Sequence, residues 1–133
     1  MKKYAVITLI LFAVSFLSGC GDDESIGIGP VKKIELGAVD KALGEKGRVI
    51  FEQKCVACHK LDSKLVGPPL KDVTKRRKPE WIMNMILNPE QMTKENTAAK
   101  QLFGQYLTQM TFQNVSQDDA RAILEYFRTI DSN

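Results

Sequence analysis

The end of the chain carries apolar residues at helical spacing and gives the clearest predicted element. A helix is expected to begin after Ser116, because Ser116 and Asp119 lie three residues apart, in the arrangement of a capping box. The apolar face of this helix consists of Ala120, Ile123, Leu124, Phe127 and Ile130. This spacing predicts a helix that packs one face on a core.

Three further helices are predicted upstream. The first covers about residues 40–53. Its core-facing side chains are Val49, Ile50 and Phe51. The second begins near Pro79, which suits a first helical turn, and ends before Asn88, while the third begins with Thr93 as its N-cap. No stretch of useful length alternates apolar and polar residues as a strand does, so we expect one all-α domain of about four helices over residues 38–133.

The first residues have the character of a secretory signal. Lys2 and Lys3 precede an apolar run that is too short to span a bilayer comfortably. The Leu-Ser-Gly-Cys sequence that follows, ending at Cys20, resembles a bacterial lipobox, in which the cysteine thiol receives a diacylglyceryl group. We expect residues 1–19 to be a lipoprotein signal peptide and Cys20 to be lipidated; an ordinary signal peptide or an uncleaved anchor is the alternative. The protein would then be anchored to a membrane of the cell envelope, facing the periplasm or the cell surface.

Residues 20–37 are rich in glycine and charge and show no sustained period, which predicts a flexible tether between lipid and domain. Fully extended, such a tether reaches on the order of 50 Å.

Composition and charge narrow the class of partner. The chain has 133 residues, of which 44% are hydrophobic, as expected for one small globular domain. It has 19 basic and 16 acidic residues, so removal of Lys2 and Lys3 leaves it nearly neutral. This balance argues against nucleic acid as a partner.

The distinctive chemistry lies in the stretch Cys-Val-Ala-Cys-His, from Cys55 to His59. Two thiols at this spacing add across the two vinyl groups of one haem, and the adjacent imidazole then reaches the iron. The chain has three cysteines, and Cys20 is the one outside this stretch. If Cys20 is lipidated and the other two bind a haem, no cysteine is left for a disulfide. A thioredoxin-like pair lacks its strand–helix context here, and a zinc site lacks a fourth ligand. We therefore expect one covalent haem c, with its iron, held by Cys55, Cys58 and His59.

The second axial ligand of the iron is a separate question. His59 is the only histidine, so a second imidazole from this chain is excluded, and methionine becomes the candidate class of ligand. Met83 and Met85 lie in a uniformly apolar run and are expected in the core. Met92, Met110 and an open or water-bound position remain.

The stretch CVACHKLDSKLVGPPLKDVTKR resembles the corresponding part of the small bacterial class I monohaem cytochromes c, the short periplasmic electron carriers, and the likeness extends to the C-terminus. The resemblance implies the class I cytochrome c fold, built around one haem. It also implies that Pro68 packs on the haem and that a carbonyl of the Gly67–Pro68 segment accepts the Nδ1 proton of His59.

The same resemblance assigns the sixth ligand by position. Met110 stands six residues before Ser116, as the axial methionine does in the short carriers, and Gln113 matches a polar residue that hydrogen-bonds the sulfur. Trp81 is expected either near a haem propionate, with its indole N–H as donor, or in the core.

These features predict a membrane-tethered one-electron carrier of respiratory electron transfer, not an enzyme, because a haem held on both faces has no vacant site for a substrate. The resemblance suggests a quinol-oxidising complex as donor and a terminal oxidase or periplasmic reductase as acceptor. Alternatives are a haem-based binder or sensor of a small gas, in which Met110 is absent or displaced, and a fixed subunit of a respiratory complex. A peroxidase-like enzyme would need a distal acid–base side chain, and no histidine is available for that role.

Overall fold

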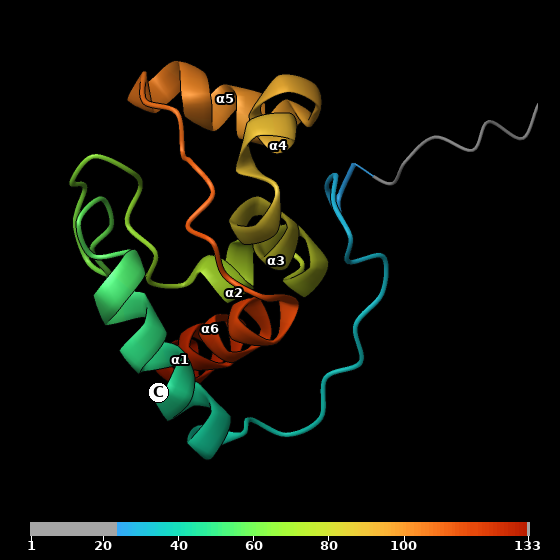
Figure 1. Ribbon diagram of the computed structural model, residues 1–133, viewed down its shortest axis with the longest axis vertical. Coiled ribbons are helices and arrows are strands. Elements are labelled where there is room, and N and C mark those ends of the chain that lie inside the picture. The colour runs from blue at the N-terminus through green and yellow to red at the C-terminus, as the bar shows by residue number, and fades with distance from the viewer. Residues whose placement is uncertain (1–23, 133) are drawn as a thin grey trace, which may run out of the picture.

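The computed structural model describes residues 24–132, and within them the chain is helical with no strands. Its helices are α1 (Lys41–Lys54), α2 (Val73–Arg76), α3 (Pro79–Leu87), α4 (Pro89–Glu95), α5 (Thr97–Tyr106) and α6 (Gln117–Asp131) (Figure 1). The all-α prediction is confirmed, with six helices in this part of the chain instead of about four. None of the helices among residues 24–132 combines the length and apolar character needed to cross a membrane. The expected signal peptide and Cys20 lie outside the described residues.

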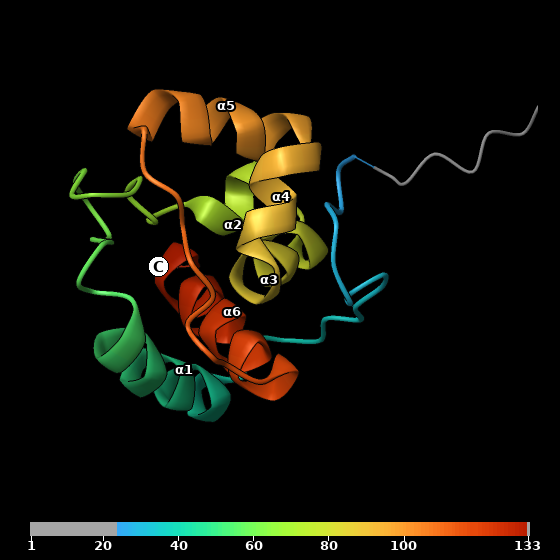
Figure 2. The ribbon, with the colours of Figure 1, turned by 45° about the horizontal axis from the view of Figure 1, so that its top comes forward.

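The crossing of α1 over α6 forms one side of the core (Figure 2). Gly47 permits the close approach, since a Cβ there would lie 1.9 Å from the carbonyl oxygen of Ala122. One turn later, the rings of Phe51 and Phe127 meet edge to face, with centroids 5.6 Å apart. Val49 lies between Gly47 and Phe51 in the sequence and therefore on the other side of the helix, so it is 40% exposed, and its expected core position is wrong.

The predicted starts of the first and last helices are confirmed. The Asp40 side chain accepts from the Leu43 N–H at 3.0 Å and caps α1. At α6, the Ser116 hydroxyl accepts from the Asp119 N–H at 3.0 Å, and the Asp119 carboxylate accepts from the Ser116 N–H at 3.1 Å. At the start of each of these helices, a local side chain accepts a hydrogen bond from a backbone N–H of the first turn, which is why the sequence alone locates the two starts.

The middle of the chain differs from the prediction. α3 begins at Pro79 and ends at Leu87, as expected, but α4 begins immediately at Pro89. Thr93 is buried inside α4 and caps nothing, while the Asn96 side chain caps α5 by accepting from the Ala99 N–H at 3.1 Å. Proline is suited to a first helical turn as well as to a helix end, so Pro89 starts a helix where a break was predicted.

The short helix α2 was not predicted, because its start is stabilised by a distant residue. The carboxylate of Asp131 accepts from the backbone N–H of Asp72 at 2.7 Å and from that of Thr74 at 3.0 Å. No local pattern signals a capping group supplied from the last turn of α6.

Residues 24–37, which we call the strap, lie against α3 and α4 (Figure 1). Val31 is 3% exposed, and its N–H donates to the side-chain oxygen of Asn84 at 2.9 Å. Further along, the Ile34 N–H donates to the carboxylate of Glu80 at 3.0 Å. These side chains bind backbone groups that a solvated tether would expose to water, so the described part of the expected tether belongs to the fold instead.

A buried carboxylate connects α6 to the start of α1. Glu125 is fully buried and forms ion pairs with Arg121 and Arg128, while its Oε1 also accepts from the Asp40 N–H at 2.8 Å. Burial raises the pKa of Glu125, but Arg121, the Asp40 N–H and Arg128 outweigh it and hold the pKa below its usual value. The ionised form is therefore the one that stabilises the fold.

Replacing this carboxylate provides a test by stability. Glu125→Gln is expected to lower the free energy of unfolding at pH 7 by about 2–4 kcal/mol, because it leaves two arginines facing a neutral group. Since the folded pKa is lowered, the stabilisation is present at neutral pH and is lost as the pH falls below about 4, where the difference from the wild type should shrink. Urea unfolding of the variant and the wild type at pH 7 and below about pH 4 measures this difference in stability. Glu45→Gln, which removes an exposed partner of Arg48, is the control and should change little; an equal effect of both variants would contradict the role of Glu125.

Candidate haem-binding site

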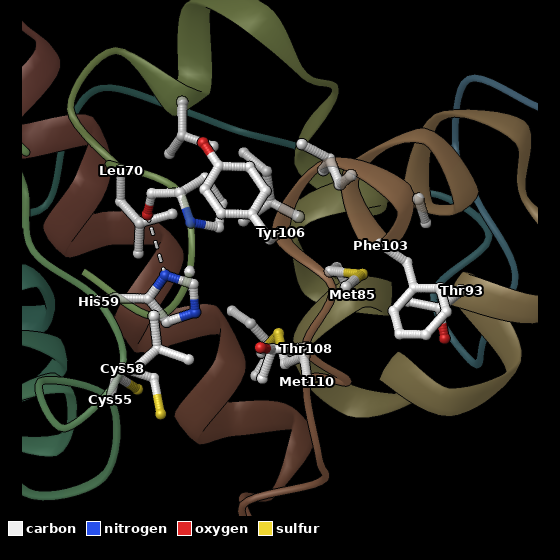
Figure 3. Close-up of a pocket in the computed structure, with 18 of the residues that line it drawn as sticks. Cys55, Cys58, His59, Leu70, Met85, Thr93, Phe103, Tyr106, Thr108 and Met110 are labelled. Carbon is white, nitrogen blue, oxygen red and sulfur yellow. Dashed lines mark hydrogen bonds between the residues drawn. The ribbon is translucent and has the colours of Figure 1, made fainter. Parts of the chain in front are cut away.

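Cys55, Cys58 and His59 lie at the end of α1, where the helix changes into a turn. The Cys55 N–H still donates to the Phe51 carbonyl at 2.8 Å, and the His59 N–H donates to the Cys55 carbonyl at 2.9 Å. The turn directs both cysteines and the imidazole to one wall of a cavity (Figure 3). Burial raises the pKa of the Cys55 thiol to about 11, so this thiol is neutral at the apolar wall.

The imidazole of His59 is held by the segment that follows. Its Nδ1 lies 3.1 Å from the Pro68 carbonyl oxygen, the hydrogen bond that the resemblance implies for this segment (Figure 3). Burial lowers the pKa of His59, and the bond to Pro68 opposes this shift. A neutral imidazole that donates from Nδ1 directs its Nε2 lone pair elsewhere, as a metal ligand must. Gly67 allows the backbone to pack closely against the imidazole, since a Cβ there would lie 2.4 Å from the imidazole Cε1.

The cavity has a volume of about 390 Å³ and lies between the Cys55–Pro69 loop, α3, α5 and residues 108–113. Its wall is largely apolar and includes Val66, Leu70, Ile82, Phe103 and Phe127. Val66 and Phe103 are 40% and 41% exposed, respectively, although both line the cavity. A large flat apolar group would cover such side chains, and the two thiols and one imidazole are the donor set for a c-type haem. The residues present therefore fit this group.

The methionines separate clearly in the structure. Met110 lines the cavity and comes from the segment after α5, on the other side of the space from the loop that carries His59 (Figure 3). Met92 is fully buried outside the cavity wall, and its sulfur accepts from the Ile28 N–H at 3.0 Å. Met83 lies in the core, as expected, whereas Met85 lines the cavity, a position that the apolar run did not reveal. Met110 is thus the methionine that a loop presents to the cavity.

Gln113 and Trp81 also line the cavity, but their polar groups have protein partners. The Gln113 side-chain amide donates to the Thr111 carbonyl at 3.0 Å. The Trp81 indole N–H donates to the Asn96 side chain at 3.0 Å, and Trp81 is 5% exposed. Of the two positions expected for Trp81, the structure has the one in the core, with the indole N–H bound to Asn96.

Basic side chains lie along the cavity wall: Lys54, Arg76 and Arg77. Arg76 donates to the carbonyls of Lys71 and Pro69, and Arg77 lies over the Trp81 ring at 4.8 Å from its centroid. These contacts fix the two arginines beside the cavity, where they suit anionic substituents of a bound group. Tyr106 is a further wall residue that the sequence did not single out. The Lys64 ammonium lies over its ring, 5.0 Å from the ring centroid.

Among residues 24–132, no three His, Cys, Asp or Glu side chains are grouped so as to hold a bare metal ion. The donor set of this cavity is instead that of a haem-binding protein.

Comparison with known proteins shows the family of the chain. The cytochrome c family model matches residues 44–131, which is more than half of the chain. The chain is similar to the cytochrome c-551 of Stutzerimonas stutzeri, with 49% identity over 37 residues; the match covers 27% of this chain and only 36% of that protein's length.

Solved structures extend the similarity over most of the chain. A cytochrome c from Rhodothermus marinus is 47% identical, with a TM-score of 0.78, over 83% of this chain and 94% of that one. An engineered form of the Rhodothermus marinus protein is 46% identical, with a TM-score of 0.77, over 83% of this chain and 95% of that one. Cytochromes c carry a covalent c-type haem with iron, and Cys55, Cys58 and His59 provide its attachment sequence. The chain, with its class I cytochrome c fold, belongs to the cytochrome c family.

Proposed function

We propose that this cytochrome c is a membrane-tethered one-electron carrier of respiratory electron transfer, with His59 and Met110 as the two axial ligands. The observation that carries the proposal is that both side chains line one cavity and come from different segments on opposite sides of it. The haem supplies an iron that exchanges single electrons. The protein would supply side chains for both axial positions of that iron, so that no other ligand can bind it.

The neighbouring residues support a closed, rigid site. The Pro68 carbonyl fixes the Nδ1–H tautomer of His59, which strengthens Nε2 as a ligand. Ligation by the Met110 thioether together with the His59 imidazole would favour the reduced form of the haem iron and raise its reduction potential. If His59 and Met110 both bound the iron, no position on it would be left for a substrate, so we propose a carrier and not an enzyme.

A second candidate is the binding of a small ligand in place of Met110. Met110 lies in residues 107–116, between α5 and α6, where no helix holds it. One structure of the engineered Rhodothermus marinus cytochrome c has the protein bound to a carbene intermediate. If the protein binds a small ligand, Met110 should bind the iron weakly or leave one axial position of the iron open.

The partners follow from the carrier role. We propose a quinol-oxidising complex as electron donor and a terminal oxidase or periplasmic reductase as acceptor, with the domain facing the periplasm or the cell surface. The lipid anchor at Cys20 would keep the domain beside these complexes at a high effective concentration.

Redox cycling in native membranes tests the carrier role. We expect the haem absorption to change to the reduced form when a quinol is added and to return when the oxidant of the acceptor is supplied, which is oxygen for a terminal oxidase and the reducible substrate for a periplasmic reductase. The small-ligand candidate predicts no change on either addition, together with a spectral shift under carbon monoxide. That pattern would reject the carrier role.

Cys20→Ser tests the tether. The variant is expected to move from the membrane fraction to the soluble fraction of the cell envelope, because the acyl chains are attached through this one thiol and lipid chains supply the membrane affinity. Haem absorption in the two fractions after centrifugation measures the distribution. A variant that still sediments with membranes after a high-salt wash would contradict lipidation at Cys20.

A further inference from the structure

The strap begins at the junction of α4 and α5. The Glu24 carbonyl accepts from the Asn96 side-chain amide at 2.9 Å, and the Glu24 carboxylate accepts from the Thr97 N–H at the first turn of α5. Asn96 is fully buried and also caps α5 through its side-chain oxygen. The first described residue of the strap is therefore fixed to a side chain that the domain itself needs.

The middle of the strap is bound by one buried amide. Asn84 is fully buried in α3 and accepts from the Val31 N–H at 2.9 Å. Its Nδ2 donates to the carbonyls of Ile26 and Val31, each at 2.9 Å. A buried amide that is satisfied only by strap backbone would be left without partners if the strap dissociated, which disfavours release.

Two glycines show how closely the strap is packed. At Gly29, a Cβ would lie 2.4 Å from the Asn84 side-chain oxygen. At Gly27, with φ +73°, a Cβ would lie 2.7 Å from the Met92 sulfur. At Gly37, the far end of the strap, an added Cβ would meet nothing within 4 Å, so close contact is confined to the α3–α4 side.

This docking changes how far the domain can move from its anchor. Only Gly21, Asp22 and Asp23 separate Cys20 from Glu24, and this link reaches at most about 13 Å when fully extended. A free tether over residues 20–37 would reach on the order of 50 Å. The α4–α5 junction is thus held within a few residues of the lipid.

The cavity loop lies on the other side of the domain. In both ribbon views the start of the strap is at the right, beside α4, and the loop that follows α1 is at the left (Figures 1 and 2). Val56 and Leu65, which lie in that loop and outside the cavity wall, are 45% and 40% exposed, respectively. A membrane at the α4–α5 junction would therefore leave the haem-attachment side turned outward.

We propose that the strap orients the domain on the membrane, with the α4–α5 junction against the lipid surface and the haem-attachment loop directed away from it. The inference rests on the proposed lipid anchor at Cys20. It implies that electrons are exchanged with partner domains that project from the membrane or are soluble. A membrane-embedded surface would not reach the exposed loop.

Linear dichroism of the haem absorption in stacked, oriented membranes tests the orientation on the full lipidated protein. The wild type is expected to be dichroic, because a fixed domain gives the haem plane a preferred angle to the membrane. A flexible Gly/Ser insert of about twelve residues after Asp23, with a root-mean-square reach of roughly 19 Å, should lower the dichroism several-fold without altering any strap contact. Gly29→Ala should lower it by displacing the strap, whereas Gly37→Ala is the matched control and should keep the wild-type signal.

The outcomes separate this inference from the anchor itself. Membrane-bound wild type without dichroism would overturn the orientation while leaving the anchor intact, as would undiminished dichroism with the long insert. Wild type that does not sediment with membranes would overturn both. If Gly29→Ala does not accumulate as folded protein, the insert still decides the question.

Discussion

Met110→Ala is expected to abolish the ferric sulfur-to-iron charge-transfer band and to make the ferrous iron bind carbon monoxide readily. The substitution removes the thioether from the cavity side opposite the His59 loop, and the small methyl group cannot reach the iron. The reduction potential should fall as well, because sulfur ligation favours the reduced iron. Absorption spectra of the oxidised and carbon monoxide-treated forms, with a redox titration, measure these changes.

Met85→Leu is the matched control, since Met85 lines the same cavity from α3 and leucine has a similar volume. This variant should keep the band and stay closed to carbon monoxide. Loss of the band in Met85→Leu, with its retention in Met110→Ala, would transfer the ligand role to Met85. Retention of the charge-transfer band in both variants would show that neither Met110 nor Met85 is the ligand.

Gly47→Ala is expected to lower the free energy of unfolding by about 3 kcal/mol or more. The new Cβ would lie 1.9 Å from the Ala122 carbonyl oxygen, and that contact is with backbone, so α1 and α6 would have to move apart. Separation would also loosen the edge-to-face contact of Phe51 with Phe127. Chemical denaturation of the haem-loaded protein, followed by helical circular dichroism, measures the loss.

Gly104→Ala is the control for this substitution. Gly104 lies inside α5 with nothing within 4 Å of an added Cβ, so alanine should stabilise the helix by roughly 0.5–1 kcal/mol. A Gly47→Ala variant as stable as Gly104→Ala would show that the α1–α6 crossing does not depend on the missing side chain.

The sequence predicts best where a feature depends on neighbours in the chain. The starts of α1 and α6 are determined by Asp40 and Ser116, which bond within their own first turns, and the Cys55–His59 motif is contiguous. The bond between His59 and Pro68 spans only nine residues and was expected from the resemblance.

The sequence fails where a distant residue decides the local structure. The strap looks like a solvated tether because its pattern lacks a period, yet Asn84 binds it from 53 residues away. α2 depends on Asp131, and the Trp81 indole is taken by Asn96, so neither outcome has a local signal. The position of Met85 in the cavity wall likewise depends on how α3 packs against the rest of the fold.

Whether His59 and Met110 both bind the iron can be read from the absorption spectrum of the purified, haem-loaded domain without Cys20, recorded first in the ferric form and then in the ferrous form under carbon monoxide. A closed iron between His59 and Met110 predicts a ferric sulfur-to-iron charge-transfer band and no shift on addition of carbon monoxide. A missing band with ready carbon monoxide binding would contradict the carrier assignment and favour a small-ligand binder.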